Sequence, residues 1–175
     1  ALRARVFSCW MIEKFGSELL KMGSGVLDVA GGKGKLSVEL AVLAQIPCTI
    51  IDPLIRGKSD TCPLMSKQLK RVKRANAPIP LHVAKFFQRN EECSAMVRKS
   101  SCVVGLHPDE CTEDILDAAL LHDKPLAIVP CCVFPGLFPM RKLKCGRPVV
   151  TNEDFLKYLL EKDDRLRKET LMFMG

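Results

Sequence analysis

The sequence lacks the features that mark membrane proteins, secreted proteins and zinc-stapled proteins. No apolar run in its 175 residues approaches the roughly 18 residues of a membrane-spanning helix. The N-terminus lacks the charged-then-apolar pattern of a secretory signal, and none of the nine cysteines forms a Cys-x-x-Cys pair. We therefore expect no membrane contact, no metal site and an intracellular, reducing compartment: the cytoplasm, the nucleus or an organelle matrix.

The residues that are present indicate one globular domain. A composition of 47% apolar and 27% charged residues suits a chain that buries a core. We expect an N-terminal helix within 1–22, a core over 25–134, and a loop, a helix and a final strand over 135–175. The chain begins with alanine and not methionine, so we expect it to be trimmed or excerpted. The sequence does not indicate an oligomeric state.

The stretch from Gly25 to Gly34 organises the rest of the chain. Its first half reads as a short buried strand, and its second half holds three glycines within four positions. Apolar residues at helical spacing follow over 35–45. A strand, a glycine turn and a helix N-terminus together direct backbone N–H groups at a bound group.

Two familiar glycine loops do not fit this stretch. A P-loop needs Ser or Thr where Leu36 stands, and its first glycine would fall at Val29. The dinucleotide fingerprint needs a third glycine in the region of Ser37. Both motifs are therefore set aside.

The loop instead resembles the nucleoside-binding loop of class I S-adenosylmethionine-dependent methyltransferases. That loop is an acidic residue followed by x-Gly-x-Gly-x-Gly, and this chain reads Asp28-Val-Ala-Gly-Gly-Lys-Gly34 with Ala30 at the first glycine. The resemblance implies S-adenosylmethionine as the cofactor. Its implied contacts from this loop are Asp28, Ala30, Gly31, Gly32 and Gly34.

A second acid supports a nucleoside site. An apolar run beginning at Thr49 ends in Asp52, eighteen positions beyond Gly34. In a βαβ unit, an acid at the tip of the second strand can accept hydrogen bonds from a ribose. The alternative is an Asp52-Pro53 turn that only ends the strand. We assign both residues to the cofactor site.

The rest of the chain alternates between strand and helix patterns. We expect strands at 25–29, 48–52, 81–84, 101–106 and 126–129, and a final strand beginning within 169–174. We expect helices at 4–20, 35–45 and 64–75, a polar helix or loop at 90–99, a helix capped by Thr112, and a helix over 151–162 capped by Thr151. This order predicts an α/β, Rossmann-like methyltransferase sandwich: a mostly parallel sheet with helices on both faces, its last strands incomplete.

A second resemblance involves the fourth and fifth strands. Gly105-Leu-His107 and the later Pro130-Cys131-Cys132 resemble a methyltransferase-like branch that includes tRNA ribose methylases. That branch has Leu-His followed by Cys-Gly, where this chain has Pro-Asp-Glu. The implied roles are a catalytic base for His107, whose alternative is an exposed loop imidazole, and cofactor contacts for Leu106 and Cys131. On a strand, the two adjacent cysteines would point to opposite faces.

The adenine end of the site is the least complete. The family commonly places an acid after the third strand, and this chain has Lys85 and Phe86 there. Both are assigned to the cofactor site by position.

The net charge of +7 indicates an anionic partner. Basic residues concentrate on one face of the 64–75 helix and in the proline-rich loop 135–148, and we expect RNA or ribonucleoprotein contacts there; the alternative is a solvated helix face. The assigned residues are Lys67, Lys70, Arg71, Arg74, Arg141 and Lys142. Two functions stay open: a methyltransferase acting on RNA, or an inactive scaffold with the same fold.

Overall fold

Five parallel strands form the centre of the molecule in our computed structural model, which describes residues 2–54 and 64–171. The strands are β1 (Val26–Val29), β2 (Cys48–Ile51), β3 (Leu81–Val83), β4 (Cys102–Leu106) and β5 (Leu126–Val129). Their order across the sheet is β3-β2-β1-β4-β5, and every neighbouring pair is parallel. The predicted α/β class and the Rossmann-like arrangement are therefore confirmed, while a methyltransferase assignment needs more than a fold.

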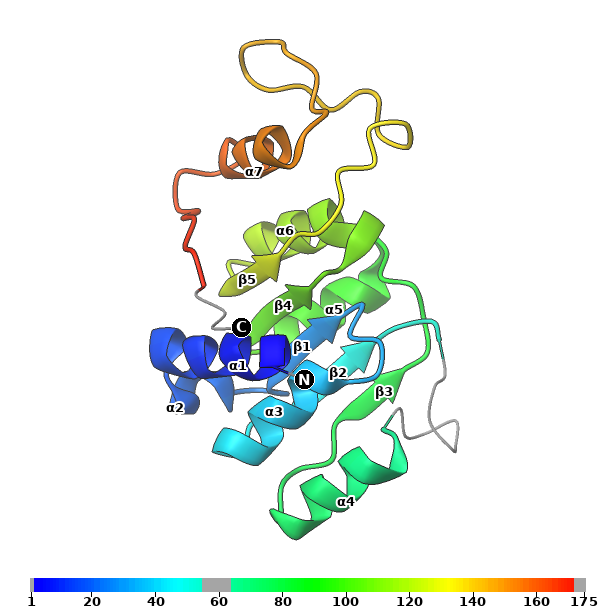
Figure 1. Cartoon of the computed structure of the whole chain (residues 1–175), viewed down its shortest axis with the longest axis vertical. Coiled ribbons are helices and arrows are strands. Elements are labelled where there is room, and N and C mark those ends of the chain that lie inside the picture. The colour runs from blue at the N-terminus through cyan, green and yellow to red at the C-terminus, as the bar shows by residue number, and fades with distance from the viewer. Residues whose placement is uncertain (1, 55–63, 172–175) are drawn as a thin grey trace.

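Helices cover both faces of this sheet (Figure 1). One face packs against α1 (Leu2–Phe15), α2 (Ser17–Leu20) and α3 (Lys35–Ala44), and the other against α5 (Glu91–Lys99) and α6 (Thr112–Leu121). Successive side chains of a strand point to opposite faces of the sheet, so Val26 packs in the core on the first face and Leu27 in the core on the second. Two further helices lie outside these layers: α4 (Ser66–Arg74) packs against α3, and α7 (Asn152–Leu160) packs against α6.

Some predicted elements need correction. The helix expected over 4–20 breaks at Gly16, whose φ of 80° ends α1 and precedes α2. Thr112 does not cap α6: a 3-10 turn at Asp109–Cys111 precedes the helix, and the Thr112 hydroxyl donates to the Asp109 carbonyl at 2.8 Å. Thr151 does cap α7, since its hydroxyl accepts from the Asp154 N–H.

The C-terminal part departs most from the prediction. The cysteine pair does not lie on a strand, since β5 ends at Val129. The segment expected to start a final strand has no strand in its described residues, which end at Leu171. The predicted strand continues outside the described residues. No helix in the described ranges is long and apolar enough to cross a membrane.

Candidate ligand site at the carboxyl edge of the sheet

The strand order defines one point where a ligand crevice is expected. From β1 the chain proceeds outward through β2 and β3, and then returns to β4 on the other side of β1. Loops that leave β1 and β4 therefore diverge, and the carboxyl edge between them is the topological switch point at which open α/β sheets bind ligands. The glycine loop follows β1, and His107 follows β4.

The three glycines of the loop have different roles. A Cβ at Gly31 would lie 2.8 Å from Asp28 Cγ, and one at Gly34 would lie 2.7 Å from Ile50 Cδ1. Both glycines thus allow the loop to pack closely on the strands beneath it. At Gly32 the φ is +54°, and a Cβ would meet only the Asp52 carboxylate, at 3.9 Å. Gly32 therefore borders open space, which suits close approach of a ligand.

Asp28 supports this loop from below. It is fully buried, and its Oδ2 accepts a hydrogen bond of 2.7 Å from the Ser37 hydroxyl, while Oδ1 has no partner among the described residues. Burial raises the pKa of Asp28 to about 6, although the bonds from Ser37 oppose this. In this conformation Asp28 positions the loop and has no exposed surface with which to contact a ligand. Sequence reasoning missed Ser37, whose only signal was its place in the first turn of the following helix.

Asp52 joins the end of β2 to the glycine loop. Its Oδ2 accepts from the Gly32 N–H at 2.8 Å, and its Oδ1 accepts from the Leu54 N–H at 2.9 Å. A carboxylate has about four acceptor positions, so two of them are left for a ligand. His82 in β3 lies with Nε2 2.8 Å from the Asp52 carbonyl oxygen, which fixes this strand end from the other side.

The end of β3 offers an aromatic ring in place of an acid. Phe86 is 70% exposed, whereas the next residue, Phe87, is buried. Lys85 is ion-paired with Glu92 at the start of α5. The position of Phe86, beside the strand that carries Asp52, suits stacking of a planar base more than hydrogen bonding to it.

Across the switch point, His107 lies at the end of β4 in a left-handed backbone conformation, with φ of 60°. Its N–H donates to the Val129 carbonyl at 3.0 Å, so β4 and β5 remain joined at this position. The ring Nδ1 is buried with no hydrogen-bond partner among the described residues. Neighbouring Leu106 is partly buried and packs against the core beneath α1 and α3.

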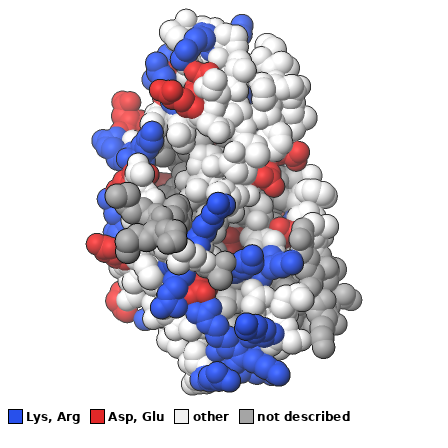
Figure 2. All heavy atoms as spheres, in the orientation of Figure 1, with Lys and Arg blue, Asp and Glu red and all other residues white. Residues whose placement is uncertain are grey.

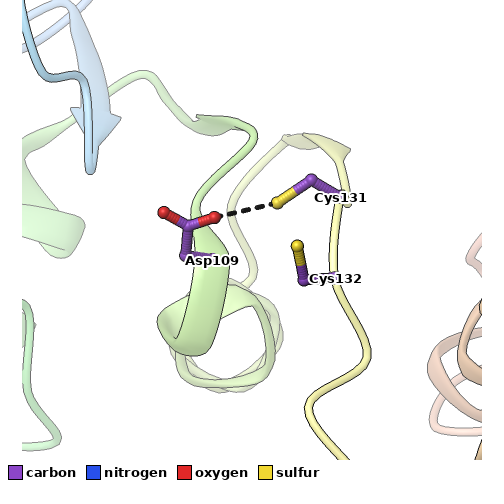
Figure 3. A group of neighbouring side chains, drawn as sticks. All are labelled: Asp109, Cys131 and Cys132. Carbon is purple, nitrogen blue, oxygen red and sulfur yellow. Dashed lines mark hydrogen bonds between the residues drawn. The ribbon is translucent and has the colours of Figure 1, made fainter.

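Beyond the ends of these two strands, one acid and two thiols come together (Figure 3). The Cys131 Sγ donates to Asp109 Oδ1 at 3.0 Å, and the Cys132 sulfur points toward the Cys131 sulfur. Burial and this bond raise the pKa of Cys131 to about 12, so the thiol stays protonated at neutral pH. Sequence reasoning singled out the cysteine pair but missed Asp109, because only the pairing of β4 with β5 brings it near.

The predicted RNA-contacting residues divide into two groups. Figure 2 shows lysine and arginine side chains gathered at the α4 end of the molecule. There Arg71 makes a bidentate pair with Glu39, while Lys67, Lys70 and Arg74 are exposed and form no ion pair within the described ranges.

Arg141 is the clearest correction. It is 7% exposed, its Nε donates to Glu113 at 2.7 Å, and its guanidinium lies over the Phe138 ring. A buried guanidinium held in this way is not available to RNA, because it serves to attach the 135–148 loop to α6. Lys142, next to it, is exposed.

A cavity also lies away from this edge of the sheet. A cavity of about 440 Å³ opens between β5, α6, α7 and residues 166–171. Its walls are mainly leucine and isoleucine side chains, and it contains none of the polar residues that follow β1, β2 or β3. Its leucine-rich walls suit an apolar group, and its polar lining comes from Asn152 and residues 167–170.

Comparison of the chain with protein-family models, curated proteins and solved structures found no match. The functional argument therefore rests on the site itself.

Proposed function

We propose that the protein is an S-adenosylmethionine-dependent methyltransferase of the class I fold, with RNA as its acceptor. The observation that carries this proposal is the 2.8 Å bond from the Gly32 N–H to the Asp52 carboxylate. It joins the loop after β1 to the acid after β2, beside the open space that Gly32 leaves. This pairing of a sterically open loop with a carboxylate is what a nucleoside with two ribose hydroxyls requires.

Each end of the cofactor has residues suited to it. Asp52 would accept hydrogen bonds from the ribose hydroxyls, and Phe86 would stack on the adenine. The glycine loop at Gly31 and Gly32 would let the amino-acid portion approach the backbone closely, with Ala30, Gly34 and Pro53 shaping the loop around it. When bound, the cofactor supplies a methyl group already activated by its positive sulfur, so the protein's main task is to position the acceptor in line with it.

His107 is the residue best placed to accept a proton from the acceptor. It follows β4 on the other side of the switch point from the glycine loop, and its Nδ1 has no protein partner in the described ranges. An unpartnered ring nitrogen can serve as a general base once an acceptor hydroxyl or ammonium reaches it. Leu106 and Cys131, near the same strand ends, would line the methyl-bearing side.

The choice of RNA is supported by the exposed lysines and arginine of α4. Lys67, Lys70 and Arg74 form a basic face with no ion pair to any residue of 2–54 or 64–171, and basic side chains of this kind bind phosphates. Lys142 is a further exposed cation, while Arg71 and Arg141 are withdrawn from this role by Glu39 and Glu113. If RNA is the acceptor, its binding should weaken steeply with salt.

Calorimetric titration of S-adenosylmethionine into the purified chain tests the proposal. We expect saturable binding to the wild type, none to Gly32→Arg, and binding weakened about 10- to 100-fold in Asp52→Asn, because a charge-assisted hydrogen bond contributes about 1.5–3 kcal/mol. Gly136→Arg is the matched control, since Gly136 has nothing within 4 Å of its would-be Cβ. No binding to a folded wild type at millimolar cofactor would rule out the enzyme and favour the inactive scaffold with the same fold.

A second measurement tests the acceptor. Tritiated cofactor incubated with total RNA and, separately, with protein extract should label only the RNA. Incorporation should fall in a Lys67→Glu, Lys70→Glu double variant and stay at the wild-type level in Lys168→Glu, which changes an exposed lysine far from α4 in the sequence. Labelling of protein alone would contradict the RNA assignment.

A further inference from the structure

The group formed by Asp109, Cys131 and Cys132 has a chemistry that methyl transfer does not use. One carboxylate oxygen and two sulfur atoms lie within 4.8 Å of one another. Around a tetrahedral metal ion with bonds of 2.0–2.3 Å, such ligand atoms lie roughly 3.3–3.8 Å apart. The existing group therefore needs to contract by only about 1 Å to surround a metal ion of this kind.

The expectation of no metal site was based on the missing Cys-x-x-Cys spacing, and on a strand the two adjacent cysteines would also point to opposite faces. In the structure β5 ends at Val129, so Cys131 and Cys132 lie in irregular backbone. Both thiols can then turn to the same side: the Cys131 sulfur points toward Asp109, and the Cys132 sulfur points toward the Cys131 sulfur (Figure 3). Two thiols on opposite faces of a strand could not bind the same ion, but these two cysteines do not lie on a strand.

The register between β4 and β5 sets the distance between Asp109, which follows β4, and the cysteine pair, which follows β5. Leu106 of β4 pairs with Val129 of β5, the last residues of both strands. Asp109 lies three residues beyond the first and Cys131 two beyond the second, so the pairing sets their separation. On the β4 arm, the Thr112 hydroxyl donates to the Asp109 carbonyl at 2.8 Å and holds the turn. The ligands are thus positioned before any ion arrives.

We propose that Asp109, Cys131 and Cys132 bind one thiophilic divalent metal ion of the zinc type. Both thiols lose their protons to solvent on binding, and the two thiolates and the carboxylate then carry one more negative charge than the ion neutralises. No fourth histidine, cysteine or carboxylate in the described part of the chain joins the group. Three protein ligands leave one coordination position for water or a substrate atom, which is the arrangement of catalytic zinc sites and not of closed structural ones.

Cobalt(II) titration tests this site independently of S-adenosylmethionine. With the full chain kept reduced by a phosphine, we expect one equivalent of Co²⁺ to bind with thiolate-to-metal charge-transfer absorption in the near ultraviolet. One equivalent of Zn²⁺ should then abolish that absorption. The Cys131→Ser, Cys132→Ser double variant should lose the band, and Asp109→Asn should weaken binding by about tenfold or more.

Cys145→Ser is the matched control, because Cys145 is exposed and outside the group. It should retain the wild-type band, and far-ultraviolet circular dichroism should show every variant folded. A folded wild type that gives no charge-transfer band would overturn the proposal. So would a band that survives in the double cysteine variant. Because cofactor binding is measured separately, a failure here leaves the methyltransferase proposal unaffected.

Discussion

The glycine loop and the C-terminal segment are attached to the rest of the molecule by different kinds of contact. At the glycine loop, a backbone without side chains packs directly on β1 and β2, and the buried acid Asp28 has a pKa raised to about 6 by burial. The C-terminal segment is instead attached to α6 by hydrogen bonds and ion pairs between polar and charged side chains. Burial alone would raise the pKa of Glu113, but hydrogen bonds from Lys162, Tyr158 and Arg141 lower it to about 2.

The difference shows which region is free to accept a ligand. Glu113 has three partners that satisfy its oxygens, and these join α6 to α7 and to the 135–148 loop. Among the described residues, the Asp52 carboxylate accepts only the Gly32 and Leu54 N–H groups, and the space beside Gly32 is open. A region whose polar groups are fully paired is structural, whereas incomplete pairing beside open space marks the region that a ligand completes.

Removing Arg141 should have the largest effect on stability. We expect Arg141→Ala to lower the free energy of unfolding by about 2–3 kcal/mol, since it leaves the partly buried Glu113 carboxylate short of a partner and removes the cation over the Phe138 ring. Urea unfolding followed by circular dichroism measures this. Lys142→Ala, at the exposed neighbouring position, should stay within about 0.5 kcal/mol of wild type. Equal effects at both positions would mean that the network does not hold the segment.

The two acids should respond to pH in opposite directions. A raised pKa in the folded state means that protonated Asp28 favours folding, so its contribution is present below the unfolded-state value of 3.8 and is lost as pH rises to about 6. This loss amounts to about 3 kcal/mol. For Glu113 the stability is present above 4.5 and is lost as pH falls toward about 2.

Comparing wild type with Asp28→Asn isolates the first effect. The difference in unfolding free energy between the variant and the wild type should grow in favour of the variant by about 2.4 kcal/mol from pH 4 to pH 7. Denaturant titrations at half-unit intervals give this slope, which does not depend on any constant offset from the amide. A flat difference would show that Asp28 ionises as freely in the folded chain as in the unfolded one.

Two adjacent glycines in the loop should differ in their tolerance of alanine. Gly31→Ala places a methyl 2.8 Å from the buried Asp28 Cγ, and we expect a loss of about 2–3 kcal/mol. Gly32→Ala meets open space and carries only the strain of its positive φ, about 1 kcal/mol. Thermal unfolding of the two variants in parallel measures both. The reverse order would mean that the loop packs differently on β1.

The sequence predicted the strands and the glycine loop well and the C-terminal region poorly. The five strands and the glycine loop were predicted because their signals are local: an apolar run for each strand, a glycine cluster after the first, and the acid Asp52 after the second. The Gly32–Asp52 contact follows once β1 and β2 pair in parallel. These features need only the period of the sequence and one topological rule.

The C-terminal region could not be predicted in this way. Arg141 reads as one member of an exposed basic run, because its partner Glu113 lies 28 residues earlier and neither neighbourhood signals the pairing. Asp109 approaches Cys131 only through the β4–β5 register. The burial of a charged residue depends on distant partners, and a local pattern does not contain them.

The smallest expected effect concerns the N-terminal cap of α7, a feature of the C-terminal region that the sequence did predict. Thr151 caps α7: its hydroxyl accepts from the Asp154 N–H at 3.1 Å, and Asp154 accepts in return from the Thr151 N–H at 3.1 Å. Thr151→Ala should lower the free energy of unfolding by about 1 kcal/mol, and Thr151→Ser should restore most of it. The loss should be seen in hydrogen exchange of α7 before that of β1, because the cap supports only its own helix. Equal acceleration of exchange in β1 would mean that the C-terminal segment and the glycine loop form one cooperative unit and not the two regions distinguished above.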